Sequence, residues 1–206
     1  MRIKRSPCWF LCLALLFAGA RSIKAQAAAP GLASVHPSGG HQTVGEVRLW
    51  VETEGKGTPL LLIAGGPGMA HDYFHYYFSP LASTHELIYF DAFGRGKADR
   101  ARDAAEYTFT RDVEEIESLR KTLGMEKMDI LGHSYGTMVA QAYALKYPAG
   151  VRRLVLISPL HSGAMWQASI DLCNRRIRDE MPEVWTKLEN LRSQGLRSSA
   201  KAHQEA

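Results

Sequence analysis

The sequence has few cysteines and no histidine pattern typical of a metal site. Three of the 206 residues are cysteines, and two of them lie near the N-terminus, which leaves Cys173. A single cysteine cannot form an intramolecular disulfide, so the fold must depend on a hydrophobic core, which the 46% hydrophobic residues can supply. The eight histidines show no paired spacing with cysteine or carboxylate. We therefore expect no metal and no cofactor, and we expect most histidines at the surface.

No apolar run is long enough to predict a membrane-spanning helix. The longest, residues 9–20, is shorter than the ~20 residues that a bilayer requires. It follows a basic start at residues 2–5 and precedes a small-residue site, Ala-Gln-Ala, at residues 25–27. This is the pattern of a signal peptide over residues 1–27. We expect an exported chain, periplasmic or secreted, that is not held in the membrane after cleavage.

The mature chain also lacks an excess of charge of either sign. Residues 1–27 hold five basic residues and no acidic one, so Lys+Arg falls from 25 to 20 against 21 Asp+Glu and the net charge changes from +4 to −1. The pI near 9.0 thus reflects the N-terminal segment. Neither nucleic acid nor an anionic membrane is expected as a partner.

The remaining chain shows strands alternating with helices. Residues 28–43 are rich in Ala, Pro, Ser and Gly and are predicted to be a linker. The predicted strands are an edge strand at 44–53 and buried strands at 60–64, 87–90, 128–131 and 151–157. Helices are expected at about 110–123, capped by Thr110, and at 136–147. This alternation predicts an α/β fold with a mostly parallel sheet, whose strand ends gather the functional residues at one edge.

After Pro159 the pattern changes. Residues 160–206 contain no buried-strand pattern, many charges, and two helical stretches at about 170–181 and 184–194, separated by Pro182. Cys173 is expected to be a core residue of the first stretch. We interpret residues 44–159 as one α/β core and residues 160–206 as part of a separate helical layer.

The most informative motif is Gly-His-Ser-Tyr-Gly at residues 132–136. It directly follows a predicted buried strand and directly precedes a predicted helix, which is the setting of a nucleophile elbow. Ser134 is therefore the candidate catalytic nucleophile. The backbone N–H of Tyr135, at the start of the helix, is a candidate oxyanion-hole donor. His133 is expected to pack or to line the site.

A second glycine motif, Gly-Gly-Pro-Gly at residues 65–68, follows the strand at 60–64. An acyl-transfer enzyme needs a backbone donor at this place, and we expect Gly66 to be that donor, with Gly65 as the alternative. Pro67 has no N–H and can only stiffen the loop. Taken alone, such a motif is equally typical of a tight turn. Asp91, which follows the next strand, is expected to hold its own turn by hydrogen bonds rather than to catalyse.

These motifs resemble the α/β-hydrolase superfamily and, within it, the proline iminopeptidase (prolyl aminopeptidase) family. The resemblance covers residues 44–159 and depends on residues 65–68, 91–96, 132–136 and 143–148. Three positions depart from the family pattern, with Ala64 in place of histidine, Ala92 in place of glutamine and Lys97 in place of serine. The departures leave the elbow intact and weaken the link to proline specificity.

The resemblance implies an α/β-hydrolase fold with a helical cap, and an acid and a histidine that follow later strands. The chain is expected to end inside the cap, so that the C-terminal strands are missing and a sheet edge prone to association is exposed. The acidic and histidine residues after Ser134 cannot be assigned as acid or base and are expected to be solvated. They are Asp171, Asp179, Glu180, Glu183, His161 and His203.

The sequence thus predicts an exported serine hydrolase that resembles proline iminopeptidase and cleaves N-terminal residues from small peptides through an acyl-enzyme at Ser134. An esterase or lipase-like hydrolase acting on small esters is one alternative. A non-catalytic, truncated remnant that lacks acid and base is the other. Epoxide hydrolases and dehalogenases are disfavoured, since they need a carboxylate where Ser134 stands. The oligomeric state is left open.

Overall fold

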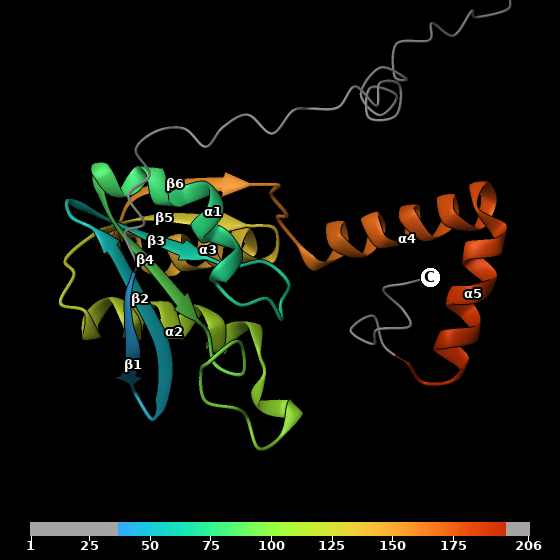
Figure 1. The fold of residues 1–206 in the computed structure, drawn as a ribbon, viewed down its shortest axis with the longest axis horizontal. Helices are drawn as coiled ribbons and strands as arrows, with labels where there is room; N and C mark the ends of the chain where they lie inside the picture. The colour runs from blue at the N-terminus through green and yellow to red at the C-terminus, as the bar shows by residue number, and fades with distance from the viewer. Residues whose placement is uncertain (1–36, 197–206) are drawn as a thin grey trace, which may run out of the picture. The chain divides into compact units, whose positions relative to one another are not determined.

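The computed structural model describes residues 37–196, which form a six-stranded sheet with helices on both faces (Figure 1). The predicted signal peptide lies outside the described residues. The strand order is β1-β2-β4-β3-β5-β6, in which β1–β2 and β2–β4 pair antiparallel and the other three pairs are parallel. The strands are β1 Ser38–Val44, β2 Val47–Gly55, β3 Thr58–Ile63, β4 His85–Asp91, β5 Met128–His133 and β6 Val151–Ile157. The predicted mostly parallel sheet is confirmed.

Helices connect the parallel strands. Within residues 37–196, none of them combines the length and the apolar character that a membrane crossing requires. The α-helices are α1 His75–Phe78, α2 Phe109–Thr122, α3 Tyr135–Lys146, α4 Gly163–Glu180 and α5 Pro182–Ser193. Short 3-10 turns are η2 Asp72–Phe74, η3 Ser79–Ser83, η4 Ala104–Glu106 and η5 Pro148–Gly150.

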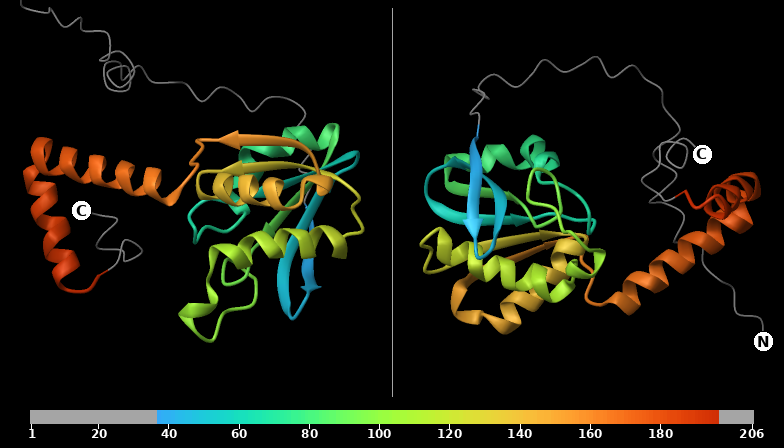
Figure 2. Two further views of the ribbon diagram at one scale, coloured as in Figure 1. Left: turned by 180° about the vertical axis from the view of Figure 1, so that it is seen from behind. Right: turned by 90° about the horizontal axis from the view of Figure 1, so that it is seen from below.

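Alternate residues of the central strands enter two different cores, because successive side chains of a strand point to opposite faces of the sheet. On β3, Leu61 and Ile63 pack in the cluster that α2 and α3 cover, whereas Leu60 and Leu62 pack in the cluster that residues 72–83 cover. The views in Figure 2 show the helical layers on the two sides of the sheet. The sheet is therefore covered on both faces around β3, β4 and β5. This packing holds in place the strand ends at which the motifs lie.

Two predictions about the N-terminal part need correction. The segment predicted as a linker, residues 28–43, includes β1 from Ser38 onward, and β2 is an inner strand between β1 and β4 rather than an edge strand. A two-residue turn joins β1 to β2, with Val44 opposite Val47 and Gly45 at a φ of 63°. Glycine adopts this conformation without strain, so a tight hairpin forms where the composition favours a loop.

The helix predicted at about 110–123 is present, but it begins earlier. Its N-cap is Thr108, whose side chain accepts a hydrogen bond from the backbone N–H of Arg111 at 3.1 Å. The predicted cap, Thr110, lies inside the helix. Threonine is a suitable cap at either position, and the extended backbone of Thr108 decides between them.

The prediction that residues 151–157 form a buried strand is wrong about burial. The strand exists as β6, but it lies at the edge of the described sheet and has no buried residue. Cys173 on α4 is also exposed, not part of a core. In both cases the apolar pattern predicted the strand or helix correctly. Burial requires another part of the protein to pack against the element, and no segment of the described chain covers these residues.

Candidate active site

The candidate nucleophile occupies a strained turn between β5 and α3. Ser134 is half-buried and has a φ of 52° and a ψ of −119°, a conformation that side-chain-bearing residues rarely adopt. A Cβ on Gly136 would lie 2.3 Å from the carbonyl oxygen of Ile63, and a Cβ on Gly132 would lie 2.5 Å from the carbonyl oxygen of Gly136. Both glycines are thus required by close backbone packing. This is the cramped strand–turn–helix geometry that the motif predicts.

Hydrogen bonds hold the backbone of this turn on both sides. The N–H of Ser134 donates to the carbonyl oxygen of Ile157 at 3.0 Å, and its carbonyl oxygen accepts from the N–H of Thr137 at 2.9 Å. The N–H of Tyr135, the first residue of α3, has no hydrogen-bond partner among residues 37–196. It lies at the positive end of a helix of twelve residues. This amide is available to an anionic oxygen.

The glycine loop at residues 65–68 lies against the elbow. A Cβ on Gly65 would come within 3.2 Å of the Cβ of Ser134, so the loop approaches the nucleophile closely. The N–H of Gly65 already donates to the hydroxyl of Tyr73 at 3.0 Å. The N–H of Gly66, at a φ of 118°, has no partner within the described part of the chain. The geometry therefore favours Gly66 over Gly65 as the loop's donor.

Tyr73 connects the glycine loop to the elbow, a role that the sequence did not indicate. Its hydroxyl accepts from the Gly65 amide and lies 2.9 Å from Nδ1 of His133. The hydroxyl donates to Nδ1 in one His133 tautomer and accepts from Nδ1–H in the other. His133 is half-buried beside the nucleophile. This contact agrees with a packing and lining role for His133.

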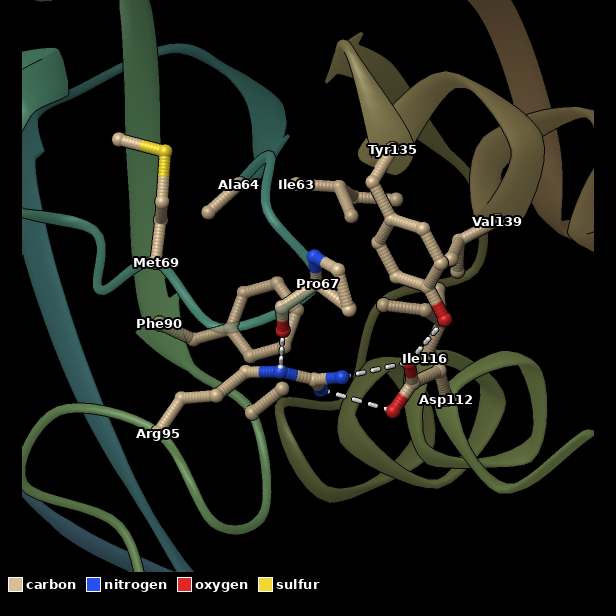
Figure 3. A pocket seen from close by; sticks show the side chains of 11 residues that line it. Ile63, Ala64, Pro67, Met69, Phe90, Arg95, Asp112, Ile116, Tyr135 and Val139 are labelled. Carbon is tan, nitrogen blue, oxygen red and sulfur yellow. Dashed lines mark hydrogen bonds and ion pairs between the residues drawn. The ribbon is translucent and has the colours of Figure 1, made fainter. Parts of the chain in front are cut away.

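A second network, shown in Figure 3, joins the loop, α2 and the elbow. The guanidinium of Arg95 makes two hydrogen bonds of 2.8 Å to the two carboxylate oxygens of Asp112, and its Nε donates to the carbonyl oxygen of Pro67. The hydroxyl of Tyr135 donates to the same carboxylate at 2.6 Å. Arg95 and Asp112 thus fix the loop and the elbow relative to each other. No motif predicts this, since the three residues are far apart in sequence.

The charges of this network are stabilised by one another. Burial disfavours the charged guanidinium of Arg95, but its hydrogen bonds to Asp112 outweigh burial and raise the pKa of Arg95. Two effects raise the pKa of the Tyr135 hydroxyl. The larger is burial, and the second is the hydrogen bond to the Asp112 carboxylate. The tyrosine therefore stays a neutral donor at physiological pH, and the arginine stays charged.

A hollow with aromatic walls opens beside this network. Its lining residues come from the glycine loop, the turn after β4, the start of α2 and the elbow. They are Pro67, Gly68, Phe93, Gly94, Arg95, Tyr107, Thr108, Phe109, Asp112 and Tyr135. Trp166 of α4 lies nearby, with its ring centroid 6.1 Å from that of Tyr135. The hollow thus offers aromatic surface to an apolar group.

Asp91 has the structural role that the sequence predicts. Its carboxylate accepts hydrogen bonds from the backbone N–H of Lys97 at 2.8 Å and of His71 at 2.9 Å, and from the His71 ring at 2.7 Å. Burial alone would raise the pKa of Asp91, but these hydrogen bonds outweigh burial and lower it. A side chain on Gly96 would collide with this carboxylate, so the glycine turn closes tightly over it.

The expectation that most histidines lie at the surface is wrong for the described residues, where only His41 and His161 of six histidines are exposed and His71 is only 3% exposed. Its ring and that of His75 converge on the carboxylate of Glu52. The sequence predicted no metal site, yet these three residues are a possible ligand set. The spacing of the two histidines, four residues apart in a helical segment, is the signal that could have indicated it.

The described residues supply no base to Ser134. Among residues 37–196, the Ser134 hydroxyl makes no hydrogen bond to a histidine. His161, Asp171 and Asp179 are exposed, and the two carboxylates contact Gln167 and Arg178 instead. His203 lies outside the described residues. His161, Asp171 and Asp179 are solvated, as expected, and none of the three forms a hydrogen bond or ion pair with Ser134.

The strand–turn–helix elbow on a mostly parallel sheet places the chain in the class of α/β hydrolases. The chain belongs to the family described as "alpha/beta hydrolase fold", whose model matches residues 58–196. A proline iminopeptidase of Heyndrickxia coagulans is 37% identical over 116 residues, which are 56% of this chain and 40% of that protein. One of Saccharolobus solfataricus is 36% identical over 137 residues, 64% of this chain and 42% of that protein.

The solved structures agree with this fold. The structure of VinJ has a TM-score of 0.70 and 23% identity and covers 82% of this chain and 58% of its own length, a likeness that shows the fold alone. The resemblance to proline iminopeptidases that the motifs indicate is confirmed by the sequence relatives. The chain spans about two fifths of the length of these curated relatives.

Proposed function

We propose that this chain carries the nucleophile and the oxyanion hole of a serine hydrolase of the proline iminopeptidase type. The observation that supports this most directly is the geometry of Ser134, which lies on a strained turn between the start of α3 and the glycine loop. The amides of Tyr135 and Gly66, one in each of these segments, have no partners in the described residues. The sequence relatives are named proline iminopeptidases, which suggests a peptide substrate with an N-terminal proline.

The proposed reaction begins with attack of Ser134 Oγ on the substrate's scissile carbonyl carbon, while a histidine takes up the serine proton. The carbonyl oxygen becomes an oxyanion, which the N–H groups of Tyr135 and Gly66 stabilise. The tetrahedral intermediate then breaks down. Its C–N bond breaks, the rest of the peptide leaves as an amine that takes the proton from the histidine, and an ester remains on Ser134. Water then hydrolyses this acyl-enzyme. Loss of one oxyanion donor in such sites costs about 10²–10³ in rate.

A proline arylamide and a simple aryl ester, assayed side by side, test this function. We expect hydrolysis of the arylamide by the protein that contains this chain, and its loss in Ser134→Ala. Ser158→Ala is the matched control, because Ser158 is the other serine at a positive φ (50°) and follows the end of β6. Hydrolysis of the ester alone would contradict the peptidase and support an esterase or lipase-like enzyme.

A non-catalytic remnant is the second candidate, favoured by the observation that no histidine reaches Ser134 within residues 37–196. A fluorophosphonate probe separates the two, since it labels only an activated serine hydroxyl. Labelling of the 206-residue chain that disappears in Ser134→Ala supports an active nucleophile. Absence of labelling, with Ser158→Ala behaving as the unchanged chain does, supports the remnant.

We also propose that the chain is exported, on the evidence of the signal-peptide pattern at residues 1–27. N-terminal sequencing of the protein from its native host tests this. A mature N-terminus at Ala28 supports export. An N-terminus at Met1 in a protein recovered from the cytoplasm contradicts it.

A further inference from the structure

A buried cluster of nitrogen and oxygen ligands lies apart from the elbow. Glu52 comes from β2, and His71 and His75 come from the helical segment that follows the glycine loop. One ligand atom from each of the three residues lies within 4.8 Å of the other two. Glu52 is 7% exposed, His71 is 3% exposed, and the side chain of His75 is 24% exposed. The cluster is therefore largely shielded from water.

The three side chains already aim at one another. Nε2 of His71 lies 3.2 Å from one carboxylate oxygen of Glu52, and Nε2 of His75 lies 3.1 Å from the other. Two ligand atoms bound to a tetrahedral Zn²⁺ at about 2.1 Å stand roughly 3.4 Å apart. The observed separations differ from that value by only a few tenths of an ångström. These two separations are those of N–H···O hydrogen bonds to different carboxylate oxygens, so an ion that binds here takes the place of the two Nε2 protons among ligand atoms that are already close together.

A further carboxylate orients one of the histidines as in known zinc sites. Nδ1 of His71 donates to Asp91 at 2.7 Å and Nε2 donates to Glu52 at 3.2 Å, so an ion that binds Nε2 displaces the proton that Glu52 now accepts. Carboxylate–histidine–metal chains of this kind fix the tautomer and raise the basicity of the ligand. Nδ1 of His75 is the only buried side-chain nitrogen or oxygen in the described residues without a hydrogen-bond partner. Nε2 of His75 donates its proton to Glu52, so an ion can use this nitrogen only after the proton moves to Nδ1.

We propose that Glu52, His71 and His75 form a zinc site with a fourth position open to water. Two imidazoles and one carboxylate are a ligand set that Zn²⁺ accepts. The site joins β2 to the segment directly after the glycine loop, so a bound ion fastens the base of that loop to the sheet. This role is structural and does not depend on the reaction at Ser134.

Two neighbouring donors compete with an ion for the Glu52 carboxylate. The indole N–H of Trp50 donates to one of its oxygens at 2.5 Å. The ammonium of Lys97 lies 3.3 Å from a carboxylate oxygen of Glu52, and its side chain is 58% exposed. A positive charge at this distance competes with a cation for the same oxygen. Because the lysine is largely solvated, it can move into water when an ion binds. Removing its charge should therefore strengthen zinc binding, whereas removing a ligand should weaken it.

The test measures Zn²⁺ binding to the purified 206-residue chain by calorimetry and by metal analysis after dialysis. We expect one ion per chain. Affinity should fall in Glu52→Gln and His75→Gln by at least the ~10–100-fold typical of losing an outer partner of a metal ligand. His85→Gln is the matched control, since His85 is a histidine on β4 whose ring, within the described residues, hydrogen-bonds only to Thr84. Circular dichroism checks that each variant is folded.

Lys97→Met tests the site in the opposite direction, because it should raise the affinity for zinc. The result therefore does not depend on interpreting a loss of binding. We expect roughly fivefold tighter zinc binding, as for loss of a partly exposed opposing charge. The proposal is overturned if the unchanged chain retains no zinc, or if Glu52→Gln and His75→Gln bind it as well as His85→Gln does. Equal affinity of Lys97→Met and the unchanged chain would also contradict the site.

Discussion

Residues 38–147 and residues 151–196 differ sharply in how their apolar side chains are covered. In the first region, β3, β4 and β5 are buried, and Leu62, Leu87 and Ile130 have no exposed surface. In the second, β6, α4 and α5 contain no buried residue. Both regions have apolar residues at the spacing of their elements. Periodicity therefore defines an element, while burial requires a second surface to pack against it.

The largest effect expected from this comparison comes from truncating one leucine in each region. Leu87 on β4 is 0% exposed, and Leu154 on β6 is 37% exposed. We expect Leu87→Ala to lower the free energy of unfolding by about 2–5 kcal/mol, because it leaves a cavity. Leu154→Ala should cost less than about 1 kcal/mol. Urea unfolding measures both, and equal losses would show that β6 is covered as well as β4.

The pH dependence of stability gives the next largest effect. Glu115 on α2 is 6% exposed and hydrogen-bonds the backbone N–H of Phe93, and burial raises its pKa from the ordinary 4.5 to about 7. Below pH 4.5 the carboxyl is neutral in both states. Between 4.5 and 7 only the unfolded chain loses the proton, so stability falls as pH rises, and above 7 the loss is complete.

This loss amounts to at most about 3 kcal/mol for a shift of that size. We expect Glu115→Gln to abolish the fall in stability between pH 4.5 and 7. Glu189→Gln, on the exposed surface of α5, is the matched control from the other region. Thermal unfolding at a series of pH values measures the effect. A Glu115→Gln profile parallel to that of Glu189→Gln would contradict the prediction.

The smallest of the three effects concerns one glycine at the start of a helix in each region. A Cβ on Gly136 in α3 would lie 2.3 Å from a backbone oxygen of β3, whereas a Cβ on Gly163 in α4 would meet nothing within 4 Å. We expect Gly136→Ala to cost about 1–3 kcal/mol through overpacking. Gly163→Ala should be neutral or slightly stabilising. Equal melting temperatures for the two variants would show that α3 can move away from β3.

Much of the sheet and the elbow could be predicted from the sequence, because both depend on local patterns. The strands at 60–64, 87–90 and 128–131 are continuous apolar runs. The elbow is five consecutive residues, and its two glycines are needed because a Cβ at either position would collide with nearby backbone. The hairpin of β1 and β2 was missed because Gly45 supports a tight turn within a segment whose composition favours a linker. The exposure of β6 was missed because no pattern within a strand reports its neighbours.

The contacts that assemble the site could not be predicted, since they join residues far apart in sequence. The Tyr73 hydroxyl decides between two neighbouring glycine amides, and Arg95 reaches Asp112 and Pro67 from a different turn. Only the fold brings these groups together. The buried pair His71 and His75 carried a readable spacing, four residues apart, but its third partner, Glu52, lies on a different strand.

The hydrogen bond from the Ser134 amide to Ile157 joins the elbow directly to β6, one of the two edge strands of the described sheet. A peptide segment that pairs alongside β6 and shifts Ile157 would thereby change the pose of the serine. Thermodynamic reciprocity then requires that an inhibitor seated at Ser134 change the affinity for that segment by the same factor. In a binding titration, the affinity for the segment at β6 would change when the inhibitor is bound at Ser134, and the affinity for the inhibitor would change when the segment is bound.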